Sequence, residues 1–296
     1  MAPKTWFCLI ATVVLWAAHP IVTRSGVKEG FAVADLVALR FGISALLFAP
    51  MFLRAVPGLE LPTIVRGIGF AISQGAPLSI LIFTGLTLAP ASHATSLVLG
   101  LVPLWVGLTS VLLYREKLPA MVAIGLAGIA AGAVVFTYAG AVPGLDVLRG
   151  DLMFVAASML ASAYFVLLRG SSVAPELAAA FIAIFSAALF LPWYFLQHRQ
   201  ATINPALLAW LFQAFYQGVL IGFVSFIAVN HAIAGLGRTT VTAVLSVVPP
   251  LTALLGIPLL DEVPTAAELG GIALITCGVL LAIREPLTPK AAAGSL

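Results

Sequence analysis

Residues 99–132, LGLVPLWVGLTSVLLYREKLPAMVAIGLAGIAAG, decide the fold, because the chain repeats their pattern at residues 245–278 as LSVVPPLTALLGIPLLDEVPTAAELGGIALITCG. At one offset of 146 residues, and without a gap, a proline, a glutamate and two glycines of the first segment meet their counterparts in the second. The pairs are Pro103 with Pro249, Glu116 with Glu262, Gly125 with Gly271, and Gly132 with Gly278. Apolar helices align easily by chance, but such a series at one spacing is much harder to obtain that way. The chain therefore contains an internal repeat.

Weaker matches extend the repeat outward from this segment in both halves of the chain. They pair Ser44 and Pro50 with Ser186 and Pro192, Gln74-Gly75 with Gln217-Gly218, and Arg24 with Arg169. Their offsets, between 142 and 145 residues, drift only as far as small loop insertions would allow. We therefore predict two related halves, residues 1–140 and residues 141–296.

The composition places both halves in a membrane. Hydrophobic residues make up 62% of the 296 residues, charged residues make up 8%, and the mean hydropathy is +1.15. A soluble domain carries about 25% charged residues, which excludes a cytoplasmic enzyme, a nucleic-acid binder and a disordered chain. Cys8 and Cys277 lie in apolar runs and offer neither a disulfide framework nor a metal cluster. The sequence predicts an all-α polytopic membrane protein without a metal or cofactor.

Ten apolar segments are long enough to cross a bilayer, for which a helix needs about 20 residues. They are Lys4–Thr23, Ala34–Arg54, Thr63–Leu86, Ser92–Tyr114, Leu118–Tyr138, Gly150–Arg169, Glu176–Leu196, Ala206–His231, Arg238–Leu259 and Pro264–Ile283. The first could be mistaken for a secretory signal. Its apolar run is longer than a signal core, and no small-residue cleavage site follows it, so we expect a retained helix.

The distribution of lysine and arginine orients these spans. With both termini in the cytoplasm, the inner segments hold nine basic residues and the outer segments hold four, as the positive-inside rule requires. The inner residues are Lys4, Arg54, Arg66, Arg115, Lys117, Arg169, Arg238, Arg284 and Lys290, and the outer ones are Arg24, Lys28, Arg149 and Arg199. We therefore predict an inner (plasma) membrane protein with cytoplasmic termini. Each half holds five spans, an odd number, so the second half must be inverted, which is typical of secondary transporters.

Several motifs give the chain a family resemblance. They are Leu15-Trp16 with His19-Pro20 in the first span, Leu39-Arg40-Phe41 in the second, and the proline–glutamate–glycine series of both halves. With these motifs the chain resembles the drug/metabolite transporter superfamily, specifically its ten-helix EamA-like members. The resemblance implies a carrier of amino acids and related metabolites, often outward, with the ten-helix aromatic amino-acid exporters as the nearest characterised type. It also implies a cavity lined by spans 1, 3, 4, 6, 8 and 9.

Charged residues are almost missing from the middle of the spans. None of the eleven acids lies there, although a carrier of lipophilic cations or a proton-coupled pump would normally hold a buried carboxylate. Arg40 is the single base within a span, whereas phosphate-bearing solutes would be helped by several. The sparse charge favours a neutral or zwitterionic, partly apolar solute, and a facilitator running down the solute's own gradient. The family resemblance implies that the solute is an amino acid above all and moves outward, and the inverted repeat implies alternating access.

Other classes of protein are weighed by the same residues. An importer or exchanger of another neutral metabolite fits the pattern too, and a non-transport membrane subunit would not need the repeat. A membrane enzyme would need clustered His, Asp or Glu at one interface, and the sequence shows no such cluster. We therefore predict that the protein is not an enzyme. The expected partners are a small-molecule solute and the lipid bilayer, with no nucleic acid, and the protein is expected to be a monomer or weak homo-oligomer.

Polar and aromatic residues within the spans are candidates for substrate binding. Gln74 and Gln217 are repeat mates near the midpoints of their spans, and their amides can donate to a carboxylate and accept from an ammonium. Hydrogen bonding between helices is the alternative. Eight further candidates have packing, interfacial anchoring or bonding to their own backbone as the alternative: Trp16, His19, Arg40, Ser96, Tyr164, Tyr216, Thr242 and Ser246. His19 could also couple a proton.

Four prolines within the spans predict helix kinks or gating points, and they are Pro20, Pro103, Pro249 and Pro250. We expect Pro103 and Pro249-Pro250 to interrupt the fourth and ninth spans. We expect Glu116 and Glu262 to cap the next helix or bond backbone at a turn, with a gating contact as the alternative for Glu262. His93 is expected to be an interfacial residue.

Overall fold

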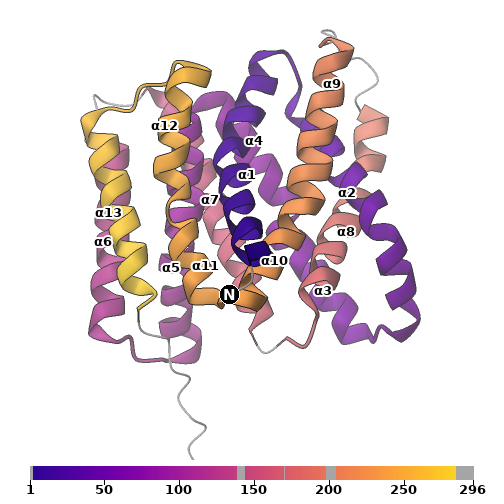
Figure 1. The fold of residues 1–296 in the computed structure, drawn as a ribbon, viewed down its shortest axis with the longest axis horizontal. Coiled ribbons are helices and arrows are strands. Elements are labelled where there is room, and N and C mark those ends of the chain that lie inside the picture. The colour runs from indigo at the N-terminus through magenta and orange to yellow at the C-terminus, as the bar shows by residue number, and fades with distance from the viewer. Residues whose placement is uncertain (1–2, 139–143, 170, 198–204, 285–296) are drawn as a thin grey trace, which may run out of the picture.

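The computed structural model describes residues 3–138, 144–169, 171–197 and 205–284, apart from the side chain of Arg238. Within these ranges the chain is helical and has no strand, and the helices stand side by side in one bundle (Figure 1). The first half contains α1 (Pro3–Lys28), α2 (Val33–Ala55), η1 (Val56–Gly58), α3 (Leu61–Gln74), α4 (Ala76–Leu88), α5 (Ala91–Tyr114) and α6 (Ala120–Tyr138). The second half contains α7 (Leu145–Leu168), α8 (Pro175–Gln197), α9 (Leu207–Gln213), η2 (Ala214–Val224), α10 (Ser225–Leu236), α11 (Arg238–Leu245), α12 (Val248–Leu260) and α13 (Ala266–Ala282).

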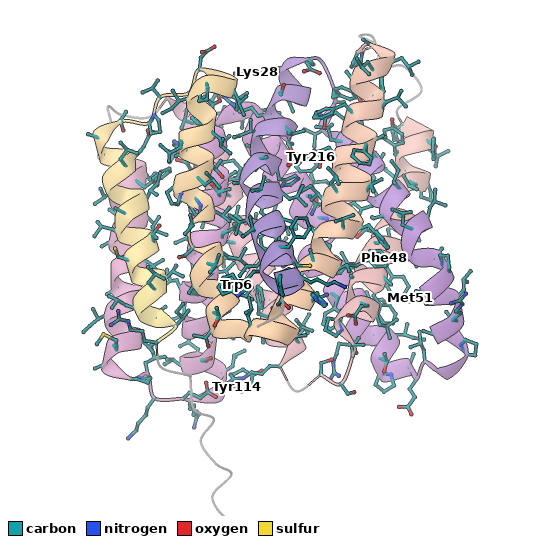
Figure 2. All side chains as sticks on the ribbon, viewed as in Figure 1. Trp6, Lys28, Phe48, Met51, Tyr114 and Tyr216 are labelled. Atoms are coloured by element: carbon teal, nitrogen blue, oxygen red, sulfur yellow. The ribbon has the colours of Figure 1, made fainter. Side chains whose placement is uncertain are left out.

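The predicted polytopic fold is confirmed. In the described ranges, nine helices or helix series are long and apolar enough to cross a membrane, and α13 is a shorter apolar helix at the position of the tenth span. Large apolar side chains cover the outside of the bundle, such as those of Leu196 (78% exposed) and Leu46 (74% exposed). Such a surface suits hydrocarbon rather than water. Lys28 and Tyr114 lie at opposite ends of the bundle in Figure 2, and we name the two membrane faces after them.

The third span is broken in its middle. Helix α3 ends at Gln74 and α4 begins at Ala76, with Gly75 between them. The freed backbone N–H of Ala76 donates to Ser186 Oγ on α8, 3.0 Å away in the other half. A Cβ on Gly75 would collide with that hydroxyl and with the carbonyl oxygen of Ala71. The sequence predicts an uninterrupted span here, and the structure differs because the group that satisfies the break comes from the other half.

The eighth and ninth spans are irregular as well. In the eighth, α9 continues into the π-helix η2, which contains Gln217, the repeat mate of Gln74. In the ninth, α11 ends at Leu245 and α12 begins at Val248, just ahead of Pro249-Pro250. By contrast, α5 continues through Pro103 and α1 continues through Pro20. Proline therefore breaks the ninth span but not the fourth. Irregular backbone inside a membrane protein is tolerated where protein groups or a polar cavity satisfy it.

The ends of α5 and α12 show the inverted repeat in backbone detail. The residue after each helix is left-handed, Arg115 with φ 51° and its repeat mate Asp261 with φ 59°. The next N–H closes the same wide turn in both halves, from Glu116 to the carbonyl of Ser110 (3.1 Å) and from Glu262 to that of Gly256 (3.2 Å). Non-glycine residues rarely adopt this conformation. Two copies at an offset of 146 residues indicate one inherited local structure.

Helices α6 and α13 pack around the symmetry axis of the repeat. A Cβ on Gly125 would lie 2.6 Å from the backbone nitrogen of Ala282, and one on its mate Gly271 would lie 2.8 Å from the backbone nitrogen of Phe136. Ala282 and Phe136 are themselves 146 residues apart. The close approach therefore occurs twice: a glycine of α6 meets the backbone near the end of α13, and the equivalent glycine of α13 meets the backbone near the end of α6. Two equivalent helices related by an inverted repeat require this reciprocity. Small residues permit such contacts between membrane helices.

Candidate functional site

A polar cluster joins the two halves inside the bundle. Arg40 Nη1 on α2 lies 2.9 Å from His19 Nε2 on α1, and that histidine nitrogen also lies 3.1 Å from Gln217 Oε1 on η2. Gln217 Nε2 donates to Thr23 Oγ1 at 2.9 Å and to Gln213 Oε1 at 3.4 Å. We call these five residues, His19, Thr23, Arg40, Gln213 and Gln217, the polar hub. Three of the predicted substrate contacts, His19, Arg40 and Gln217, therefore lie together.

Helical spacing and burial hold the hub in place. His19 and Thr23 are one turn apart on α1, and Gln213 and Gln217 are four residues apart on the second-half span. Gln217 and Thr23 are fully buried, while His19 and Arg40 are half-buried. The ring of Phe83 faces both, 5.7 Å from the His19 ring and 6.0 Å from the Arg40 guanidinium carbon. A groove of about 790 Å³ between α2 and α8 lies elsewhere, and no hub residue lines it.

Gln74 does not share the setting of its repeat mate. It is the last residue of α3, half-buried at the helix break. Among the described residues, its side chain makes no hydrogen bond to Gln217 or to another member of the hub. The two glutamines therefore fall at matching points of the repeat but have different surroundings.

The remaining candidates divide between backbone bonding and apolar packing. Tyr216 donates to the carbonyl of Leu15 at 2.9 Å, and Ser246 donates to the carbonyl of Ala243 at 2.7 Å. Ser96 is fully buried, and its hydroxyl has no hydrogen-bond partner in the described part of the chain. Three others are half-buried: Trp16 packs against an apolar cluster, Tyr164 packs edge-on against Phe70, and Thr242 lies on α11.

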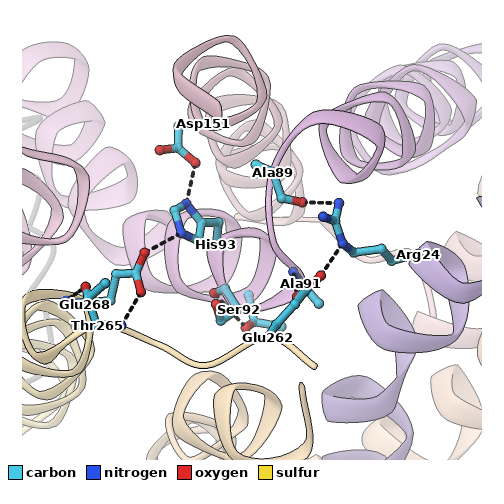
Figure 3. A network of polar contacts seen from close by, with 10 residues as sticks. Arg24, Ala89, Ala91, Ser92, His93, Asp151, Glu262, Thr265 and Glu268 are labelled. Carbon is cyan, nitrogen blue, oxygen red and sulfur yellow. Dashed lines mark hydrogen bonds and ion pairs between the residues drawn. The ribbon is translucent and has the colours of Figure 1, made fainter. Parts of the chain in front are cut away.

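A first ion pair that the sequence analysis missed closes the Lys28 face. Arg24 on α1 pairs with Glu262, which follows α12 in the other half (Figure 3). Arg24 Nη1 also donates to the carbonyl oxygens of Leu86 (2.5 Å) and Ala89 (2.6 Å) at the end of α4. The second carboxylate oxygen of Glu262 accepts from the backbone N–H of Ala91, at the start of α5, at 2.8 Å. We call this group the Arg24 bridge.

A second ion pair repeats the first at the Tyr114 face. Arg169, at the end of α7, donates to Glu116 Oε1 at 2.6 Å and to Ser110 Oγ at 3.3 Å. Its guanidinium carbon lies 4.7 Å from the centre of the Tyr114 ring. Glu116 Oε2 is buried and has no hydrogen-bond partner among the described residues. We call this group the Arg169 bridge.

The two bridges are one arrangement used twice. Arg24 aligns with Arg169 and Glu116 aligns with Glu262, so each bridge takes its arginine from one half and its glutamate from the other. The internal repeat contained both matches, but it could not show that the pairs cross between halves. Neither glutamate bonds to the helix that follows it in the described ranges, so that branch of the prediction is wrong. The other branch, a bond to backbone at a turn, fits Glu262, which accepts from the N–H of Ala91 beside the α4–α5 connection.

The side chain of His93, in the first turn of α5, is buried within the protein, where Nδ1 lies 2.7 Å from Asp151 on α7 and Nε2 lies 3.1 Å from Glu268 on α13 (Figure 3). Its interfacial depth in the membrane stays a prediction. Glu268 in turn accepts from the N–H of Thr265 at 2.7 Å, which closes the N-terminal cap of α13. The cluster ties three helices together near the Arg24 bridge. The signal in the sequence was that Asp151 and Glu268 stand at span ends, where acids are otherwise few.

Ten spans in two inverted halves, with broken helices and a polar hub between the halves, define a multi-pass membrane protein of the inverted-repeat transporter class. A model of the EamA-like transporter family matches residues 4–138 and again residues 148–284. The chain therefore belongs to the EamA-like transporter family, within the drug/metabolite transporter superfamily, and is a membrane transporter of small substrates.

A comparison with solved structures supports the fold, and none of the comparisons names a substrate. A solved structure described only as "Crystal structure of protein" is 25% identical, with a TM-score of 0.62, and the match covers 95% of this chain and 98% of that one. No curated protein matches the chain. The choice of substrate therefore has to be argued from the residues of the site.

Proposed function

We propose that this protein is a secondary transporter that exports small neutral or zwitterionic metabolites, amino acids above all, by alternating access. The observation that carries the proposal is the pair of matching bridges, one at each membrane face. The halves of an inverted repeat can exchange conformations, so a contact that closes one face has a counterpart that closes the other. Opening the two bridges in turn would expose the polar hub to one side and then to the other.

The unequal state of the two bridges supports this proposal. Glu262 uses both carboxylate oxygens, whereas Glu116 leaves Oε2 without a partner in the described residues. By the offset of 146 residues, the counterpart of the Ala91 N–H that Glu262 binds is the N–H of Gly237. In this structure the Gly237 N–H donates to the carbonyl of Ile233 at 2.9 Å, and its transfer to Glu116 would complete the Arg169 bridge. The arrangement fits a state in which the Lys28 face is closed more fully than the Tyr114 face.

The polar hub suits a zwitterion. Amide, hydroxyl and guanidinium groups from both halves supply donors for a carboxylate and acceptors for an ammonium. The neighbouring ring of Phe83 supplies an apolar surface. The resemblance to aromatic amino-acid exporters adds Trp16 and Tyr164 as candidates for stacking on a planar side chain. Gln74, Ser96, Thr242 and Ser246 stay predictions as substrate contacts.

The orientation and energetics follow from the distribution of charge. We place both termini in the cytoplasm and the protein in the inner membrane. With this orientation nine basic residues lie on the cytoplasmic side and four on the outer side. Two of these residues, Arg199 and Lys290, lie outside the described residues, as does the boundary between residues 140 and 141. The proposed transporter is a monomer or weak homo-oligomer that moves its solute down the solute's own gradient.

Transport by the purified protein in proteoliposomes tests the proposal. Vesicles loaded with one unlabelled amino acid at a time should exchange it for the same labelled amino acid outside, and vesicles without protein should not. Net flux measured separately in both orientations distinguishes an exporter from the alternative importer or exchanger. The absence of flux for every amino acid and for other small neutral metabolites would contradict the proposal.

Replacing Gln217 by leucine should lower this flux at least about tenfold, because leucine cannot hydrogen-bond to His19 and Thr23 and leaves buried polar groups unpaired. Gln197→Leu is the matched control, since Gln197 is exposed at the end of α8 and should leave flux unchanged. Gln74→Leu, measured in the same assay, shows whether flux also depends on the repeat mate of Gln217. Wild-type flux in a folded Gln217→Leu protein would remove the hub from the transport path.

A further inference from the structure

Within the described ranges, the guanidinium of Arg40 has no carboxylate counter-ion. No Asp or Glu in the described part of the chain forms an ion pair with it, although acids pair with Arg24, Arg149 and Arg169. Within the same residues its one side-chain hydrogen-bonding neighbour is His19, and the rings of Phe41 and Phe83 flank it. A charge within a membrane span is expensive to keep unpaired, and it is usually functional. The side chain is half-buried, so part of it faces accessible space.

The neighbouring amides are fixed in orientation by a chain of hydrogen bonds. Gln213 Nε2 donates to the carbonyl oxygen of Val22 at 2.9 Å, which leaves Gln213 Oε1 as the acceptor facing Gln217. Gln217 therefore presents its Nε2 to Gln213 and to Thr23. As a result, its oxygen Oε1 faces His19.

His19 Nε2 consequently has two neighbours with opposite demands. Arg40 can only donate to it, and Gln217 Oε1 can only accept from it. One ring nitrogen either carries a proton or offers a lone pair, so it satisfies one neighbour and leaves the other unsatisfied. Without a ligand, this nitrogen therefore leaves either the Arg40 guanidinium or the Gln217 oxygen unsatisfied, and an added acceptor for Arg40 would satisfy both.

We propose that the transported solute carries a carboxylate that binds Arg40, and that His19 is then released to donate from Nε2 to Gln217. A carboxylate supplies both the missing negative charge and the missing acceptor, and its two oxygens match the planar fork of a guanidinium. A phosphate group would bring more negative charge than one arginine neutralises. A neutral solute without an acidic group would leave the guanidinium unpaired. The inference rests on the proposed transport function and names the group that its substrates share.

Matched acid and amide pairs test the inference on the purified full-length protein in detergent. The probes are L-phenylalanine, L-leucine and L-alanine against their amides, and acetate, L-lactate and benzoate against acetamide, lactamide and benzamide. Thermal unfolding and titration should show at least one acid binding about tenfold or more tightly than its amide, because the amide loses a charge-assisted hydrogen bond. Equal binding within every pair, or no binding by any acid, would overturn the inference.

Substitutions assign the preference to Arg40. Arg40→Gln should reduce the difference between acid and amide to less than about threefold, and Arg40→Lys should keep part of it, since lysine retains the charge but not the fork. Arg54→Gln is the control, because Arg54 is exposed in the last turn of the same helix and should leave the preference unchanged. A full acid preference in Arg40→Gln would contradict the assignment. If Arg40→Gln does not fold, the acid and amide pairs measured on the wild type and on Arg40→Lys still test whether a carboxylate binds Arg40.

The flux assay separates this inference from the transport proposal. Flux that makes no distinction between acids and amides would keep the transporter and reject the carboxylate. Tight, Arg40-dependent binding of acids without any flux would keep the carboxylate site and reject transport of those solutes.

Discussion

Glu262→Gln lowers transport in proteoliposomes at least about tenfold, by our expectation, because it removes the charge that holds the Lys28 face closed. The side chains of Arg24 and Glu262 are only 17% and 15% exposed, so water compensates poorly for the lost partner. An uncharged amide also accepts less strongly from the N–H of Ala91 than the carboxylate does. The hub residues are untouched, so binding of a solute should survive when transport is lost.

The control for this prediction is another ion pair, formed by Asp146 and Arg149 at 3.1 Å with side chains 71% and 59% exposed. Exposed pairs contribute little to stability, so Asp146→Asn should transport at the wild-type rate. Glu116→Gln, at the opposite bridge, should impair transport as Glu262→Gln does. Wild-type flux in Glu262→Gln, or an equal loss in Asp146→Asn, would refute a gating role for the Arg24 bridge.

Gly271→Val should cause a large loss of stability, because it places a side chain where α6 and α13 meet backbone to backbone. A Cβ at this position would lie 2.8 Å from the Cα and the backbone nitrogen of Phe136, so α6 and α13 would have to move apart. Overpacking of this kind typically costs about 1–3 kcal/mol, and here the obstacle is backbone, which cannot rotate away. The neighbouring Gly270 supplies the matched control, because a Cβ there would meet nothing within 4 Å.

The measurement is the midpoint of thermal unfolding in detergent for Gly270→Val and Gly271→Val beside the wild type. The two variants share helix α13, residue type and propensity cost, so the difference between them isolates the contact with α6. Equal midpoints for both variants would contradict the close packing of α6 and α13 about the repeat axis.

The spans and the repeat could be predicted from the sequence because both depend on features local to the chain. The length of an apolar run fixes whether it crosses a bilayer. The series that begins at Pro103 and ends at Gly132 recurs without a gap, so its copy can be found by comparing the chain with itself. The structure gives the glycines of this series a physical reason, since they lie where α6 and α13 approach most closely.

The break in the ninth span was predicted from Pro249-Pro250, but the break in the third span was not, because the group that satisfies it lies far along the chain. The stretch around Gly75 carries one local signal, Pro77 in the first turn of α4, but the group that stabilises the break, the hydroxyl of Ser186, is 110 residues from Ala76. Pro103 shows the converse, because a residue expected to interrupt its helix is accommodated within α5. Local propensity is a weak guide where tertiary contacts decide.

The candidate site was predicted in part, for similar reasons. Symmetry suggested that Gln74 and Gln217 form one site, but only Gln217 has Thr23 and Gln213 within reach. The partnership of His19 with Arg40 joins α1 to α2 and needs the packed bundle to be seen. The bridges and the His93 cluster were missed for the same reason, since pairs such as Arg24 and Glu262 are 238 residues apart.

The central claim is that the two bridges open in alternation, and distances between spin labels at the two faces test it most directly. In a background lacking Cys8 and Cys277, one label pair replaces Glu29 and Val263 beside the Arg24 bridge, and another replaces Lys117 and Ser172 beside the Arg169 bridge. All four positions are exposed at helix ends or in connections.

The account predicts opposite changes at the two faces in liposomes. Glu262→Gln should lengthen the distance between labels at residues 29 and 263 and leave the pair at 117 and 172 short, and Glu116→Gln should do the reverse. Lengthening of both distances by either variant, or no change in both variants, would contradict alternating closure by the two bridges.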